Sequence, residues 1–157
     1  FLLIKYWMAN NTMAKAINKT DKNYRFLFFG IASALFLIAH SIFLGIKFDY
    51  DLYKLFRRFI LLSFIIFELV AQALLVITLF KIKNKISEII NKKILTLKII
   101  LVFILTAVAL ASLPIVASSG HTNFKHALEW NYFVGIITFY LLTFFFWKKK
   151  WAHTDLH

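Results

Sequence analysis

The chain of 157 residues is 61% hydrophobic, and 19 of its residues are phenylalanine. A soluble domain is nearer half apolar, so this composition excludes an ordinary soluble protein and is typical of a helical membrane protein. The absence of cysteine excludes thiol chemistry and thiolate metal sites, and the meaning of the +12 net charge depends on where the cations lie.

Residues 1–24 precede the first long apolar run. Their opening stretch, "FLLIKYWM", is too short to cross a bilayer, so we expect a polar or interfacial N-terminal segment. The apolar run that follows, 26–46, is too long for a cleavable signal and has no small-residue cleavage site before a soluble domain. We therefore expect this run to be the first membrane span.

Four apolar runs in total are long enough to cross a membrane. They cover about residues 26–46, 59–80, 99–117 and 130–147. A helix needs about 20 residues to cross a hydrocarbon core of about 30 Å, and none of the runs has the alternation of a barrel strand. Short loops make consecutive helices neighbours. The sequence predicts one domain, 1–157: an all-α membrane protein built as an antiparallel four-helix transmembrane bundle.

The cations are distributed by membrane side. Fourteen lie before the first run, between the second and third, and after the fourth, whereas five lie in the loops 47–58 and 118–129. Basic loops stay in the cytoplasm, so we expect both termini on the cytoplasmic (inner) side and those two loops outside. This spread does not match a nucleic-acid interface. The Lys, Asn, Ile and Phe bias suggests an AT-rich genome, and we expect the inner membrane of a bacterium or an organelle.

The basic loop between the second and third runs carries isoleucines at helical spacing. Ile82, Ile86, Ile89 and Ile90 fall near one face, with lysines on the others. This pattern predicts a short amphipathic helix lying on the inner membrane surface.

A few polar residues lie inside the predicted spans. Glu68 is formally charged near a bilayer midplane, where an acid is costly and therefore a candidate functional residue. Gln72 follows at i+4 on the same face. His40 shares a stripe with Gly30 and Ser33, whose small side chains allow another helix to approach. We expect His40 to face the bundle interior and Glu68 to be protonated or hydrogen-bonded.

A second polar group precedes the fourth run, in "HTNFKHALEWNYF". We expect this segment to extend the fourth helix outward, with Asn123 near its N-cap. His126 and Glu129 are three residues apart and share a face, and they form an outer-mouth cluster with Asn131. If the helices form an ordinary bundle, this cluster lies near His40 and above Glu68.

These residues admit several interpretations. In the one we favour they cap, anchor and pack helices, and no cofactor is bound. An alternative is a b-type haem held by His40 with His126 or His121, since two imidazoles on facing helices can ligate iron. A metal site is not expected, because Glu68 lies too deep to join the histidines. A proton or solute path through Glu68 is a third interpretation.

The function predicted from the sequence is therefore non-enzymatic. We expect a small integral membrane protein that serves as an accessory or anchor subunit of a larger complex, contacting lipid and other membrane subunits but no nucleic acid. The alternatives are an electron-transfer subunit binding haem b or quinone, and a small transporter or channel that uses Glu68.

Overall fold

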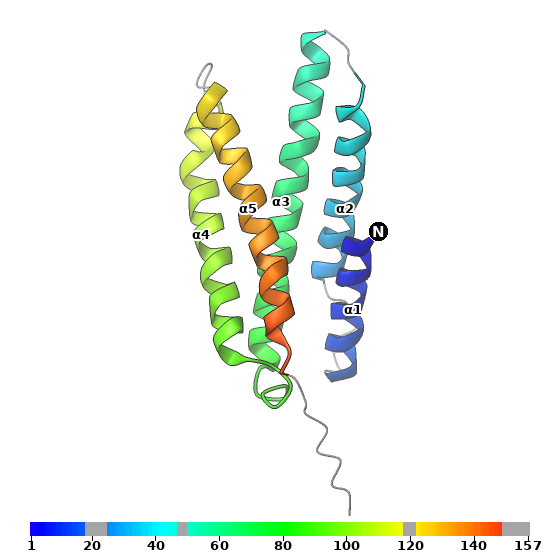
Figure 1. Ribbon diagram of the computed structural model, residues 1–157, viewed down its shortest axis with the longest axis vertical. Helices are drawn as coiled ribbons and strands as arrows, with labels where there is room; N and C mark the ends of the chain where they lie inside the picture. Colours follow the sequence, from blue (N-terminus) through cyan, green and yellow to red (C-terminus); the bar gives the residue numbers. More distant parts are fainter. Residues whose placement is uncertain (18–24, 47–49, 118–121, 149–157) are drawn as a thin grey trace, which may run out of the picture.

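The computed structural model describes residues 1–17, 25–46, 50–117 and 122–148, with the side chains of these residues other than 113–117, 122, 123 and 125. Within these ranges the chain forms five helices and no strand. They are α1 (Leu2–Ile17), α2 (Arg25–Leu44), α3 (Asp51–Ile82), α4 (Lys92–Ala117) and α5 (Thr122–Phe146). Figure 1 shows the four longer helices side by side, with α1 against the beginning of α2.

Four of the helices are long and apolar enough to cross a membrane. The qualifying segments are α2, α3, Lys92–Ser112 of α4 and His126–Phe146 of α5. A helix satisfies all of its backbone hydrogen bonds within itself, which is what a bilayer interior requires. The prediction of an all-helical chain with four span-length apolar helices is confirmed.

Helix α3 extends well past the apolar run that predicts it. That run covers 59–80, whereas α3 has 32 residues. Lys54, Arg57 and Arg58 lower the hydropathy of the first turns, but lysine and arginine are good helix formers. Asp51 further supports this end, because an acid is favourable in a first helical turn and its Oδ1 lies 3.1 Å from Lys54 Nζ. Hydropathy locates the apolar part of a helix and misses such polar extensions.

Two clusters of buried apolar side chains hold the helices together. The larger cluster joins α1 and α2 to α3, α4 and α5, and includes Trp7, Phe26, Leu75, Leu79, Phe139 and Phe146. The smaller lies in the other half of the bundle and comprises Phe64, Ile65, Leu105, Leu128, Tyr132 and Ile136. Many large apolar side chains outside these clusters are exposed, as expected for helices surrounded by lipid.

The connection between α3 and α4 corrects one prediction. Residues 83–89 form consecutive turns, not the amphipathic surface helix that the isoleucine spacing predicts. The backbone pairs with the end of α5, since Asn91 N donates to Phe146 O (2.8 Å) and Lys148 N donates to Ile89 O (2.9 Å). Ile82, Ile86 and Ile90 are buried, whereas Ile89 is exposed. Three buried isoleucines and the pairing with α5 favour compact turns beneath the bundle.

Helix α1 makes contacts that the sequence does not predict. Trp7 and Ala14 are fully buried, and Trp7 packs against Phe26 of α2. The buried Asn10 is accommodated because its Nδ2 donates to Tyr6 O at 2.9 Å. The described part of the N-terminal segment is thus packed on the bundle, and its position relative to the membrane surface stays a prediction.

Candidate functional site

Glu68 lies near the middle of α3, and its side chain is fully buried. Three side chains from α2, α3 and α5 bond to its carboxyl group. Ser33 Oγ lies 2.6 Å from Oε2, Gln72 Nε2 donates to Oε1 at 3.0 Å, and the Tyr140 hydroxyl donates to Oε1. The structure therefore brings Glu68 and Gln72 together. Ser33 and Tyr140 are partners that sequence reasoning did not assign to Glu68.

The number of hydrogens around Ser33 favours a neutral Glu68. The single Ser33 hydroxyl lies 2.9 Å from Gly30 O as well as 2.6 Å from Glu68 Oε2. A carbonyl oxygen can only accept, so both bonds form when Ser33 donates to Gly30 and a protonated Oε2 donates to Ser33. Oε1 then accepts from Tyr140 and Gln72. In this arrangement the hydrogen bonds of the carboxyl group are all made inside the bundle.

A second buried polar group surrounds Lys98, which the sequence assigns to the basic inner loop. In the structure Lys98 lies within α4 and is 1% exposed. Its Nζ donates to Thr143 Oγ1 at 2.6 Å and lies 4.3 Å from the centroid of the Phe139 ring and 5.3 Å from that of Phe146. Aromatic faces attract an ammonium group, so these rings favour the charged form of a lysine whose burial opposes it.

Tyr6 of α1 lies between the two buried polar groups. Its hydroxyl is 3.4 Å from Thr143 Oγ1, and its ring packs edge-to-face on the Tyr140 ring with centroids 4.8 Å apart. Burial raises the pKa of the Tyr6 phenol above its ordinary value, so the hydroxyl keeps its proton. Contacts through Tyr140, Tyr6 and Thr143 thus link the surroundings of Glu68 to those of Lys98.

The outer-mouth cluster lies near the beginning of α5. His126 Nδ1 is 3.2 Å from Glu129 Oε2, and the side chains are 60% and 20% exposed respectively. Asn131 is exposed. His121 lies outside the described residues, and so does the side chain of Asn123. The structure therefore joins His126 to Glu129 and leaves Asn131 pointing away from the bundle core.

His40 is half-buried toward the end of α2. Its Nδ1 has no hydrogen-bond partner within the part of the chain that the structure describes, and Arg57 and Glu129 are its charged neighbours. His40 thus approaches the outer-mouth cluster, whereas Glu68 bonds to Ser33, Gln72 and Tyr140 of the interior. Haem ligation by His40 with His126 or His121 stays a prediction.

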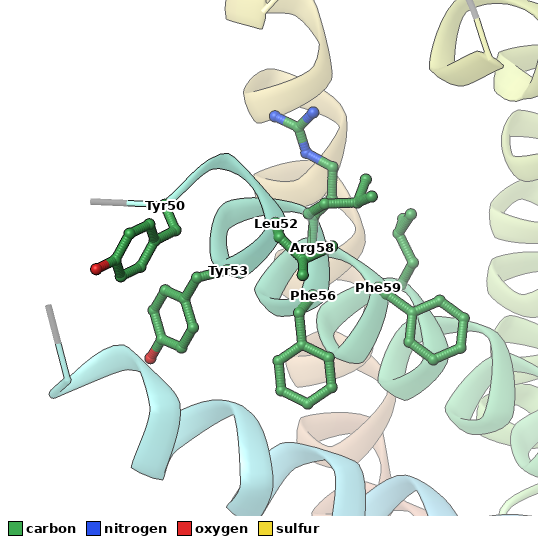
Figure 2. A pocket seen from close by; sticks show the side chains of 8 residues that line it. Tyr50, Leu52, Tyr53, Phe56, Arg58 and Phe59 are labelled. Atoms are coloured by element: carbon green, nitrogen blue, oxygen red, sulfur yellow. The ribbon is translucent and has the colours of Figure 1, made fainter. Parts of the chain in front are cut away.

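Two cavities adjoin the end of α3 that begins at Asp51. A slot of about 160 Å³ lies between α3, α4 and α5, with mainly apolar walls and four polar residues, Arg58, Ser112, Glu129 and Tyr132. An apolar groove of about 1020 Å³, here named the outer groove after the side on which the sequence predicts this end of α3, is lined by Tyr50 and the first turns of α3. It shares Arg58 and Leu62 with the slot. Figure 2 shows the Tyr50, Tyr53 and Phe56 rings on one side of α3 and the Arg58 guanidinium on another.

Comparisons with protein-family models, with curated proteins and with solved structures found no match for this chain. Its function is therefore inferred from the chemistry of the buried polar groups, the outer cavities and the exposed apolar surface.

Proposed function

We propose that this small integral membrane protein is a non-enzymatic accessory or anchor subunit of a larger complex in a bacterial or organellar inner membrane. Its two buried ionisable side chains on the spans bond to other polar side chains of the bundle: Glu68 to Ser33, Gln72 and Tyr140, and Lys98 to Thr143. These hydrogen bonds connect neighbouring helices. The outer surface of the bundle is then the part of the protein that is available to contact a partner.

The observation that carries this proposal is the outer extension of α3. Figure 1 shows α3 continuing past the end of α2. With 32 residues, α3 is about 48 Å long. Even a tilt of about 40° leaves a height of about 37 Å, more than the hydrocarbon core of about 30 Å. Besides its charged residues, the extension carries exposed apolar side chains, among them Leu52 (78% exposed) and Leu55 (64%), and Phe59 (63%) follows where the apolar run begins.

Apolar surface that projects past the hydrocarbon core is costly to leave in water. The side chains that line the outer groove form a patch of this kind, and such patches mark protein or membrane contacts. A partner subunit that contacts the outer groove removes this surface from water, which is why we favour an accessory role.

Photo-crosslinking in native membranes tests the accessory role. A photoreactive phenylalanine replacing Leu55 should form a discrete protein adduct, because this side chain lies in the groove assigned to the partner. The matched control is Leu141 of α5, which is similarly exposed (60% against 64%) but lies within a span. The Leu141 position should label lipid and give no discrete protein band. Equal labelling at both positions would argue against a partner at the outer groove.

The proposed topology is an antiparallel bundle with both termini on the cytoplasmic side. It is supported by the asymmetry of the cations and by the alternating directions of α2, α3, α4 and α5 in Figure 1. The chain has no native cysteine, so single cysteines give a clean test. Cysteine at the exposed Glu88 should react with an impermeant maleimide only from the cytoplasmic face, and cysteine at the exposed Asp51 only from the opposite face. Reaction of both from one face contradicts this topology.

The two alternative functions have distinct tests. Transport through Glu68 requires proton-dependent uptake in liposomes that is lost in Glu68→Gln. Haem or quinone binding requires an absorption spectrum, with a Soret band for haem, that co-purifies with the protein. The accessory role is preferred because the carboxyl group of Glu68 is fully buried and bonded within the bundle.

A further inference from the structure

The slot between α3, α4 and α5 carries opposite charges that do not neutralise each other. Arg58 of α3 and Glu129 of α5 both line it. Within the described residues the ion pairs are Lys54 with Asp51 and His126 with Glu129, so Arg58 and Glu129 are not in contact. His126 contacts Glu129 Oε2 and leaves Oε1 without a hydrogen bond in the described part of the chain. The slot therefore offers a separate site for an anion and for a cation.

A buried hydroxyl in the same slot lacks a hydrogen-bond partner. Tyr132 is 7% exposed, and its hydroxyl makes no hydrogen bond with any residue that the structure describes. Ser112 is a polar neighbour; the Ser112 hydroxyl donates to Ala109 O at 2.9 Å, and its oxygen makes no hydrogen bond of normal geometry with the Tyr132 hydroxyl. A buried hydroxyl without a partner costs about 1–3 kcal/mol, so the Tyr132 O–H is a donor suited to an acceptor atom of a ligand.

The remaining wall of the slot is apolar. Ile65, Ile66 and Leu69 of α3 lie successively deeper along the helix from Arg58, and Leu128 faces them from α5. A molecule that fits this order has a charged head, a hydrogen-bond acceptor below the head and an apolar chain below the acceptor. A phospholipid has these three parts in this sequence.

We propose that the slot is a specific site for a zwitterionic phospholipid whose head carries a primary amine, that is, for a phosphatidylethanolamine. The phosphate binds the guanidinium of Arg58, which suits phosphate oxygens as a bidentate donor. The ammonium binds Glu129 Oε1. The ester carbonyl accepts from the Tyr132 hydroxyl, and one acyl chain lies along Ile65, Ile66 and Leu69. This site shares Arg58 and Leu62 with the outer groove, so the lipid head lies beside the partner contact proposed there.

Native mass spectrometry of the full chain in mild detergent tests this site. The protein is titrated with phosphatidylethanolamine, phosphatidylglycerol or phosphatidylcholine carrying the same acyl chains. We expect one phosphatidylethanolamine to bind about ten-fold more tightly than either other lipid, since phosphatidylglycerol lacks the ammonium and phosphatidylcholine lacks its N–H donors. Equal binding of the three lipids would show annular lipid only and overturn the proposal. Tighter binding of phosphatidylglycerol would overturn it too.

Three variants assign the contacts. Arg58→Gln should weaken phosphatidylethanolamine binding about ten-fold, and Tyr132→Phe about five-fold. Glu129→Gln should remove the preference over phosphatidylcholine. Arg25→Gln, an exposed cation at the start of α2, is the matched charge control and should change nothing. The headgroup series on the unaltered protein decides the proposal even where a variant folds poorly, and an Arg58→Gln protein that folds and binds normally contradicts it.

Discussion

Replacing Glu68 with lysine is expected to prevent stable folding of the bundle. The carboxyl group is fully buried, and Tyr140 and Gln72 both donate to its Oε1. An ammonium group has only donors, so it would leave the Tyr140 hydroxyl and Gln72 Nε2 without their acceptor and place a charge in a dry interior. An uncompensated buried charge costs about 3–5 kcal/mol, a large part of the stability of a small protein. The measurement is the yield of monodisperse protein and its free energy of unfolding in detergent.

The matched substitutions Glu68→Gln and Glu68→Ala separate the protonation states of the carboxyl group. A glutamine amide reproduces the neutral acid, because its oxygen accepts from Tyr140 and Gln72 while its nitrogen donates to Ser33. We therefore expect Glu68→Gln to change the free energy of unfolding by less than about 1 kcal/mol, and Glu68→Ala to lower it by about 3 kcal/mol through a cavity and unpaired donors. Equal destabilisation by both changes would show that Glu68 is ionised in the folded state.

Apolar run length predicts the spans because a bilayer leaves few alternatives to a helix of about 20 residues. The same rule misplaces Lys98. Its charge removes it from the hydropathy window, yet Thr143 and the ring of Phe139 accommodate its ammonium inside the bundle. The contacts of α1 are likewise hidden, because a stretch too short to span gives no hydropathy signal even when Trp7 is fully buried.

In the candidate site, too, contacts within one helix could be predicted from the sequence, whereas contacts between helices could not. The i,i+4 spacing placed Glu68 and Gln72 on one face, and His126 and Glu129 at i,i+3, because both relations follow from helix geometry alone. Tyr140 could not be assigned to Glu68, since that contact depends on how α5 is rotated against α3. The unpartnered Tyr132 hydroxyl was hidden for the same reason: in sequence it is one aromatic residue among many.

Replacing Gly30, in the stripe of small residues on α2, is expected to destabilise the bundle strongly. Gly30 was expected to let another helix approach, and the helix that does so is α1. A Cβ built on Gly30 would lie 2.3 Å from Cδ2 of the Trp7 indole, which is itself fully buried. Gly30→Ala should therefore lower the free energy of unfolding by about 3 kcal/mol, the upper end for overpacking. A cysteine placed at Asn11 of α1 should then react faster with a maleimide, because displacement of the Trp7 indole moves α1 away from α2 and exposes this position.

Gly135 of α5 is the matched control, because an added Cβ there also meets a close neighbour. Its nearest atom is Leu105 Cδ2 at 2.5 Å, the end of a flexible side chain that can adopt another rotamer, whereas the Trp7 ring is rigid and enclosed on its other sides. Gly135→Ala should cost about 1 kcal/mol and leave the Asn11 cysteine protected. If the two alanine variants were equally stable and equally protected, α1 would not be held against α2 by the indole of Trp7. Helix α1 would then not be packed firmly on the bundle, and Tyr6 of α1 could not link the surroundings of Glu68 to those of Lys98.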